Sequence, residues 1–239
     1  MNVGEWLQKQ VDSWGVRLSD QQLKQFHQYY ELLIEWNRVM NLTGITEEKE
    51  VYVKHFYDSL TLARVLPVNS LQSMIDVGTG AGFPGIPLKI AFPHLQVVLL
   101  DSLKKRVGFL EEVCQELGLT EVKCIHGRAE EFAHKKEFRQ SFDLATARAV
   151  AKLNVLSEYC LPFVKVNGWF IAMKGMEISE EVTEAKPALH KLGKVSMEKV
   201  KFSLPEEMGE RHLLVMKKRD NSPKQYPRKA GMPTKQPIQ

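Results

Sequence analysis

A short glycine-rich segment has the residue types and spacing of a ligand-binding loop. The stretch MIDVGTGAGFPGIPL (74–88) runs from apolar residues into Gly78, Gly80 and Gly82. Glycines let the backbone turn sharply and let a ligand approach without interference from Cβ atoms. Their G-x-G-x-G spacing places the third glycine one residue earlier than the dinucleotide fingerprint G-x-G-x-x-G does. We therefore predict that this loop binds a nucleotide-like ligand.

Two aspartates bear on the identity of that ligand. Asp101 ends the next apolar run, where an acid can accept hydrogen bonds from both hydroxyls of a ribose, as in NAD or S-adenosylmethionine (SAM). Asp76 stands two residues before Gly78, where its carboxylate would repel a pyrophosphate but attract the amino group and sulfonium of SAM. Either cofactor could use Asp101, so it is Asp76 that favours SAM.

Alternating strands and helices are predicted to position these residues. Five apolar runs predict strands, at 74–77, 96–101, 122–125, 143–147 and 169–173. Helical segments at 84–92 and 103–117 lie between them, which indicates βαβ units and a parallel sheet covered on both faces. The last two runs, 194–204 and 211–218, follow each other without a helix and predict an antiparallel hairpin at one sheet edge. The fold class is therefore α/β.

The first 66 residues have a helical pattern instead. Ser19 and Gln22 form a capping box before an apolar repeat at helical spacing. Thr46, followed by several acids, begins another predicted helix. The chain thus divides into an N-terminal helical extension (1–66), an α/β domain (67–218) and a basic, proline-rich tail (219–239).

Composition excludes several classes of protein. The 239 residues are 44% hydrophobic and 26% charged, as in ordinary globular proteins. We find no apolar run of about 18 residues, the length of a membrane span, and no signal-peptide pattern at the start. Three cysteines without a C-x-x-C pair, and no H-E-x-x-H, argue against disulfides and metal sites. We expect a cytoplasmic protein without metal, and a monomer, because no heptad or large apolar edge is evident.

Basic residues gather at the C-terminal end. Residues 217–239 hold seven lysines and arginines and one acid, whereas acids slightly outnumber bases in the rest of the chain. This segment predicts either a polyanionic partner or a solvated, disordered terminus, and its prolines give no reason to predict a helix. The residues expected to grip a nucleic-acid backbone are Lys54, His55, Lys217, Lys218, Arg228 and Lys229.

Seven short blocks are spread over nearly the whole chain: NLTGIT (41–46), HFYDSL (55–60), DVGTGAGFPGIPL (76–88), LLDSLKKRVGFL (99–110), GRAEE (127–131), ARAVA (147–151) and KG (174–175). Together they resemble the RsmG (GidB) family of methyltransferases of bacterial small-subunit ribosomal RNA. The tail YPRKAGMPTKQPI (226–238) is similar to an ending found in many Gram-positive members and lacking in others.

The resemblance implies a Rossmann-like class I SAM-dependent methyltransferase with a mostly parallel seven-stranded sheet. It implies methylation of N7 of one guanine in the 16S rRNA loop near the decoding site, with 16S rRNA or a small-subunit precursor as partner. By motif, Gly78 and Phe83 would contact the cofactor, Ala129 and Glu130 would flank its adenine, and Arg148 would lie at the methyl-transfer site.

The residues after the fourth predicted strand agree with that target. Methylation of an exocyclic amine usually goes with N/D-P-P-Y/F there, and the chain has DLATARAVA (143–151) instead. No cysteine stands in the P-C or T-C context of a pyrimidine C5 nucleophile. Guanine N7 carries a lone pair and no proton, so orientation suffices, and our hypothesis is that Arg148 orients the base. A small-molecule SAM methyltransferase and a nucleotide- or RNA-binding protein without chemistry stay open as alternatives.

Overall fold

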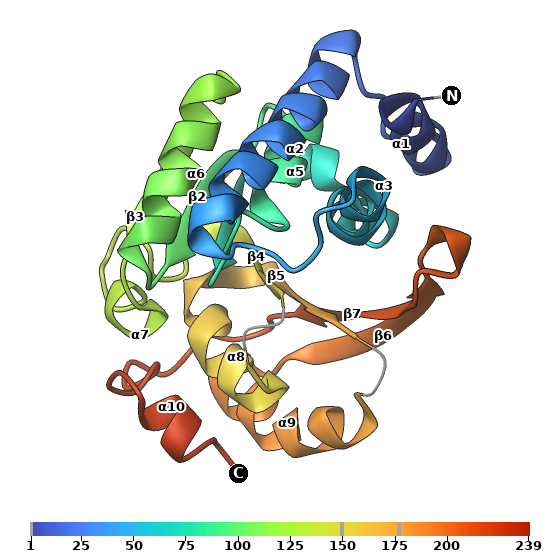
Figure 1. Ribbon diagram of the computed structural model, residues 1–239. Helices are drawn as coiled ribbons and strands as arrows, with labels where there is room; N and C mark the ends of the chain where they lie inside the picture. Colours follow the sequence, from blue (N-terminus) through green and yellow to red (C-terminus); the bar gives the residue numbers. More distant parts are fainter. Residues whose placement is uncertain (1, 149–150, 176–177) are drawn as a thin grey trace.

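A seven-stranded sheet forms the centre of the part of the chain that the computed structural model describes, residues 2–148, 151–175 and 178–239 (Figure 1). Ala149 and Val150 of the ARAVA block lie outside the described residues. The strands are β1 (Ser73–Val77), β2 (Gln96–Asp101), β3 (Val122–His126), β4 (Phe142–Arg148), β5 (Val164–Lys174), β6 (Ser196–Ser203) and β7 (Glu210–Lys217).

The strand order is β3-β2-β1-β4-β5-β7-β6. Strands β1 to β5 pair in parallel, whereas β7 pairs antiparallel with both β5 and β6. The predicted mostly parallel sheet with a C-terminal antiparallel hairpin is therefore confirmed. The order reverses between β1 and β4, and folds of this kind bind ligands beyond the carboxyl ends of the strands at such a point.

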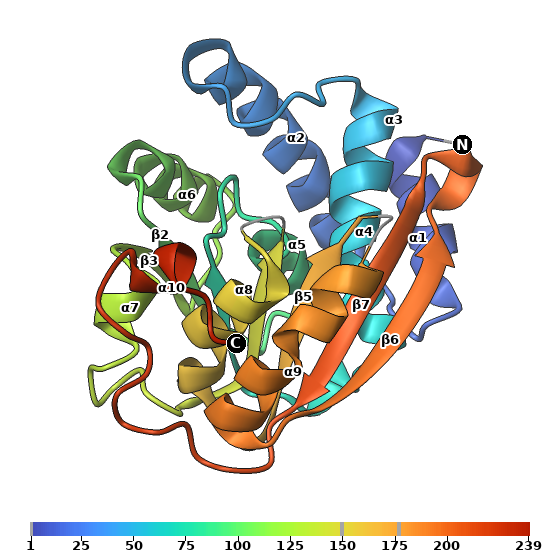
Figure 2. The same cartoon turned by 90° about the horizontal axis from the view of Figure 1, so that it is seen from below.

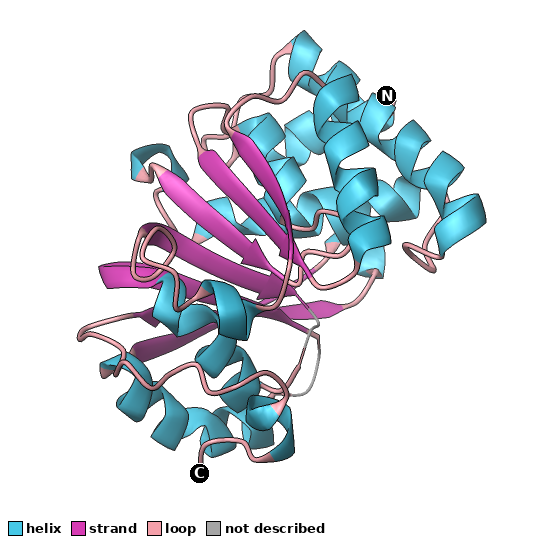
Figure 3. Ribbon diagram, turned by 90° about the vertical axis from the view of Figure 1, so that its left-hand side faces the viewer, coloured by secondary structure: helices cyan, strands magenta, loops and turns pink. Residues whose placement is uncertain are grey.

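Helices cover both faces of the sheet (Figure 3). The N-terminal ones are α1 (Val3–Asp12), α2 (Asp20–Met40) and α3 (Glu48–Val51), which continues through a π-helical segment (Tyr52–Tyr57) into α4 (Asp58–Leu60). The later ones are α5 (Gly85–Ala91), α6 (Lys104–Glu116), α7 (Ala129–Phe132), α8 (Leu153–Cys160), α9 (Ser179–Gly193) and α10 (Met232–Lys235).

Helix α2 begins where the capping box predicts. The Ser19 hydroxyl accepts a hydrogen bond from the Gln22 backbone N–H, and the Gln22 side chain accepts one from the Ser19 N–H. This reciprocal pair satisfies two of the backbone donors that a helix start leaves open. The apolar repeat then buries Phe26, Tyr29 and Leu33.

Two hydrophobic cores lie on the two faces of the sheet. One face packs against α1 to α6, and its core includes Leu99 and Leu144 of the sheet together with Phe26 of α2. The other face packs against α7, α8 and α9, and its core extends to Tyr226 and Ile238 near the C-terminus. The N-terminal helical extension therefore shares a core with the sheet.

Candidate active site

A cavity of about 500 Å³ lies beyond the carboxyl ends of β1, β2 and β4. Small-molecule sites are typically of this size. It is lined by Leu42, Thr43, His55, Gly78, Thr79, Gly80, Ala81, Phe83, Asp101, Ser102, Leu103, Arg106 and Arg148. Five residues predicted to contact the cofactor therefore meet at one place: Gly78, Gly80, Phe83, Asp101 and Arg148.

Two of the three glycines of the loop, Gly80 and Gly82, differ in what surrounds them. All three adopt positive φ angles. A Cβ on Gly80 would point into open space, so a ligand can approach its backbone closely. A Cβ on Gly82 would instead lie 2.8 Å from the Tyr29 hydroxyl. Gly82 does not line the cavity and serves the packing of the loop against α2, which revises its predicted role as a cofactor contact.

Asp76 lies beneath the loop and does not face the cavity. Its side chain is fully buried, and Oδ2 accepts hydrogen bonds from the Thr79 hydroxyl at 2.7 Å and the Gly85 N–H at 2.9 Å. Burial raises its pKa to about 6, although both hydrogen bonds act in the other direction. The sequence predicts that this carboxylate attracts the amino group and sulfonium of SAM; the structure shows that it braces the loop from beneath, where its charge can still act on a ligand.

Asp101 occupies the position predicted for a ribose acceptor at the end of β2. Its Oδ2 accepts a hydrogen bond from the Gly80 N–H and its Oδ1 accepts one from the Leu103 N–H, both at 2.9 Å. Each carboxylate oxygen has two lone-pair directions, so both oxygens can accept a further bond. Arg106 lies 3.7 Å away and keeps the local charge balanced.

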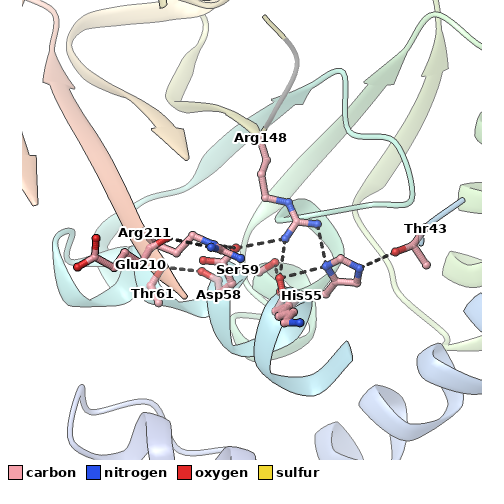
Figure 4. Close-up of polar contacts among 9 residues, drawn as sticks. Thr43, His55, Asp58, Ser59, Thr61, Arg148, Glu210 and Arg211 are labelled. Carbon is pink, nitrogen blue, oxygen red and sulfur yellow. Dashed lines mark hydrogen bonds and ion pairs between the residues drawn. The ribbon is translucent and has the colours of Figure 1, made fainter. Parts of the chain in front are cut away.

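Arg148 reaches from the end of β4 to the N-terminal helical segment (Figure 4). Its Nη1 lies 3.4 Å from Asp58 Oδ2 and 3.3 Å from the Lys54 carbonyl oxygen. Its guanidinium carbon also lies 4.8 Å from the centre of the Phe83 ring, a cation–π contact. Burial lowers the pKa of Arg148 and Asp58 opposes that effect, so the arginine stays a cation held over the cavity.

His55 contributes a neutral ring to this cluster. Its Nδ1 lies 3.3 Å from Arg148 Nη2 and 3.1 Å from the Lys54 carbonyl oxygen, and its Nε2 lies 2.9 Å from the Thr43 hydroxyl. The ring stacks on Phe83 with 4.5 Å between centres. Burial, with Arg148 next, lowers the pKa of His55 to about 3. The contact of His55 with the RNA backbone stays a prediction, and it would be made by a neutral ring.

The GRAEE block lies next to Asp101. The Gly127 N–H donates to the Asp101 carbonyl at 3.0 Å, and Ala129 and Glu130 begin α7. Both side chains are buried, and neither lines the 500 Å³ cavity. Glu130 Oε1 accepts a hydrogen bond from the Gly231 N–H at 3.0 Å. This carboxylate is therefore already paired with the C-terminal segment.

Two predicted RNA-gripping lysines lie away from the cavity. Lys217 is in register with Trp169, whereas the cavity lies at the opposite end of β5, near Lys174. Lys218 is fully buried, and its ammonium donates to the carbonyls of Leu161 and Val164, each at 2.8 Å. Burial lowers its pKa to about 7. The prediction that Lys218 grips RNA is wrong, because its ammonium group is buried and donates to carbonyls inside the protein.

The remaining predicted RNA contacts differ in exposure. The Arg228 guanidinium is paired with the fully buried carboxylate of Glu158, so its charge is already compensated, and its contact with RNA stays a prediction. The Lys54 ammonium is bonded to Glu50, whereas Lys229 is exposed. The tail itself is packed on the protein and contains α10, where no helix was predicted.

Sequence reasoning missed several residues of the site. Thr43 and Arg106 line the cavity, and Asp58 and Arg211 complete the ion-pair cluster, with 3.6 Å between Arg211 Nε and Asp58 Oδ2. Thr43, Asp58 and Arg106 all lie in blocks that carried the family resemblance, so the signal was present without an assigned role. Arg211 lies in no such block.

Two searches over the part of the chain that the structure describes gave negative results. No group of three histidine, cysteine or acidic side chains there is arranged to hold a metal ion. Of the helices described, none combines the length and the apolar character that crossing a bilayer requires.

Comparisons with known proteins bear on this site. A family model described as GidB, rRNA small subunit methyltransferase G, matches residues 22–214. A relative from Brevibacillus brevis, named Ribosomal RNA small subunit methyltransferase G, is 54% identical over 224 residues, or 94% of each chain. A relative of the same name from Halalkalibacterium halodurans is 52% identical over 238 residues and covers 100% of both chains.

Solved structures with low sequence identity share the fold. An O-methyltransferase from Bacillus cereus, in complex with SAH, has a TM-score of 0.58 at 14% identity and covers 80% of this chain and 91% of its own. The YcgJ protein of Bacillus subtilis has a TM-score of 0.53 at 15% identity and covers 70% of this chain and 100% of its own. These likenesses confirm the predicted Rossmann-like α/β fold.

Proposed function

Because this chain belongs to the GidB family of rRNA small subunit methyltransferase G proteins, we propose that it transfers a methyl group from SAM to N7 of one guanine in 16S rRNA. The substrate is 16S rRNA or a small-subunit precursor, and the enzyme acts as a cytoplasmic monomer. The observation that carries the proposal is the arrangement of the cavity, with the glycine loop and Asp101 on one wall and the anchored Arg148 on another.

The residues of the cavity fit SAM. Asp101 can accept from the ribose hydroxyls, and the open space at Gly80 admits a close approach to the backbone. Asp76 Oδ1 is buried and has no hydrogen-bond partner among the described residues, which leaves negative potential beneath the loop. Leu103 is 52% exposed at the rim, where it offers apolar surface to an adenine. SAM supplies a methyl group on a positively charged sulfur.

The protein's own task is to orient the acceptor. Guanine N7 needs no general base, and His55 is a very poor one because its pKa lies near 3. Arg148 donates to guanine O6 or to a flanking phosphate and so fixes the angle at which N7 approaches. Orientation of this kind can supply about 7–11 kcal/mol of the barrier. The apolar ring of Phe83 keeps water from the same wall.

The decisive experiment maps methylated guanines in 16S rRNA by mass spectrometry. RNA from cells with and without the gene is compared, and purified protein is then added to the unmethylated RNA with SAM. We expect one N7-methylguanine to disappear and to be restored. Arg148→Ala should restore it at least tenfold more slowly, since a lost charged hydrogen bond costs about 1.5–3 kcal/mol. An unchanged map in cells lacking the gene would overturn the proposal.

A further inference from the structure

The C-terminal segment, residues 219–238, packs along the face of the molecule formed by α7 and α8 (Figure 1; Figure 2). The Arg139 guanidinium donates to the backbone carbonyls of Ser222, Pro223 and Tyr226 at distances of 2.8–3.0 Å. Tyr226 and Ile238 are buried in the core on that side. The segment is therefore fixed at both ends of its path.

An ion pair anchors the middle of the segment. Arg228 Nη2 lies 2.7 Å from Glu158 Oε2, and both Nε and the backbone N–H of Arg228 donate to Glu158 Oε1. Glu158 belongs to α8 and is fully buried. A buried carboxylate needs such a partner, so removal of the arginine leaves an uncompensated charge.

Beyond this anchor, the segment touches the block predicted to flank adenine. The Gly231 N–H donates to Glu130 Oε1, and the Tyr159 and Thr234 hydroxyls are 3.0 Å apart. Helix α7 (Ala129–Phe132), which carries Glu130, is only one turn long. The bond from Gly231 therefore holds one oxygen of the buried Glu130 carboxylate.

We propose that the C-terminal segment is a positioning element of the cofactor site, which orients Glu130 and α7 for the adenine end of SAM through the Arg228–Glu158 anchor and the Gly231 N–H. This inference rests on the proposed function, because it takes SAM as the ligand. A site held ready in its binding geometry loses less entropy when the ligand binds. The basic tail thus has a structural task in addition to any contact with RNA.

The test compares full-length Arg228→Ala with Lys224→Ala, which removes the same charge from an exposed position of the segment. Affinity for SAH and for adenosine is measured by calorimetry. We expect Arg228→Ala to bind both roughly five- to twentyfold more weakly, and Lys224→Ala to bind as the wild type does. An equal loss for adenosine and SAH is expected because the proposal assigns Glu130 to the adenine end, which both ligands share.

A second variant guards against unfolding. In Arg228→Ala/Glu158→Gln the buried carboxylate is neutral, so the fold is kept while the anchor is lost. This double variant should show the same loss of affinity with a cooperative unfolding transition. If it binds SAH like the wild type, or loses only affinity for RNA, the positioning role is overturned. If wild-type protein itself binds no SAH, the proposed function fails, and this inference falls with it.

Discussion

Asp58 is the acid that pairs with Arg148 at the end of β4. It receives Arg148 from β4 and Arg211 from β7 on the same oxygen, while its other oxygen, Oδ1, has no hydrogen-bond partner among the described residues (Figure 4). Burial raises the pKa of Asp58, and the two arginines act against this. The carboxylate therefore acts as a positioning group for Arg148.

Asp58→Asn keeps the size of this side chain and removes its charge. We expect kcat for rRNA methylation to fall about 10–100-fold, because charged hydrogen bonds of this kind contribute about 1.5–3 kcal/mol. Affinity for SAH should change less than twofold, since Asp58 does not line the cavity. Glu50→Gln, at the acid bonded to Lys54, is the control and should leave kcat unchanged. A loss confined to SAH affinity would contradict the positioning role.

We expect the buried charge of Asp76 to lower the stability of the fold while it strengthens cofactor binding. Its pKa is raised to about 6 in the folded protein from 3.8, so its contribution to stability is fully present below pH 3.8 and is lost as the pH rises through 6. At pH 8 the buried charge costs on the order of 1–3 kcal/mol. Asp76→Asn should therefore raise Tm at pH 8 by about 2–8 °C, while weakening SAH binding.

The pH dependence checks the cause of that gain. Differential scanning calorimetry should show the advantage of Asp76→Asn shrinking between pH 8 and pH 5, as the wild-type carboxyl becomes protonated. A gain that is the same at both values would mean that packing, and not charge, was responsible. Thr79→Val, which removes one donor to the carboxylate, should lower Tm at pH 8.

At the scale of elements, Lys218 joins the end of β7 to the turn before β5. Its ammonium bonds the carbonyls of Leu161 and Val164, and the side-chain oxygen of Gln140 at 3.0 Å. Lys218→Met keeps the apolar stem but removes the ammonium donor from the buried Leu161 and Val164 carbonyls, of which the first keeps a bond from the Val164 N–H, at a cost of about 2–3 kcal/mol. We expect thermal unfolding to show a Tm lower by about 4–12 °C, with unchanged RNA affinity. Weaker RNA binding in the folded variant would restore the original prediction.

Strands β1, β2 and β4 were predictable because they are short apolar runs that the sheet buries, whereas the edge strand β6 is largely exposed. Helices α8 and α9 were not predicted individually. All but one residue of α8 is buried, so it lacks the polar face that marks a surface helix, and α9 contains Pro187, which normally interrupts a helix. The pattern of polar and apolar residues therefore predicted the strands of the sheet better than it predicted α8 and α9, the helices that cover its second face.

The site was predictable where a residue's role depends on its own segment. Gly80 and Asp101 lie in adjacent loops and are joined by a hydrogen bond from the Gly80 N–H, and a local motif was enough to predict the role of each. The tasks of His55, Lys218 and Arg228 depend on partners far away in the sequence; Glu158 lies 70 residues before Arg228. Since residue type alone cannot distinguish an exposed cation from a buried one with a partner, these residues were assigned to RNA.

At the scale of the whole molecule, net charge gives a prediction about RNA affinity. Lys229 and Lys235 are exposed on the outer side of the C-terminal segment. If these lysines contact phosphates, Lys229→Ala/Lys235→Ala should make the negative slope of log affinity against log salt concentration less steep by about 1–2. Fluorescence anisotropy with a 16S rRNA fragment at 50–200 mM salt, a range in which such contacts weaken strongly, measures that slope.

A matched pair elsewhere on the surface serves as the control for that measurement. Lys9 and Lys24 are exposed on α1 and α2. Lys9→Ala/Lys24→Ala makes the same change in net charge and should leave the slope as it is. Equal slopes for both double variants would show that the tail lysines are not special contacts and that only net charge matters.

The pairing of Asp58 with Arg211, and of Glu130 with Gly231, has a consequence for the nascent chain. Ribosomes synthesise the glycine loop and β1 to β4 long before Arg211 and Gly231, so Asp58 at first has only Arg148 as its cationic partner and Glu130 lacks the Gly231 N–H. Contacts that span most of a polypeptide form late in folding. A nascent chain should therefore lack methyltransferase activity until the segment from Arg211 onward has left the ribosome, so the enzyme acts on rRNA only after its own synthesis is nearly finished.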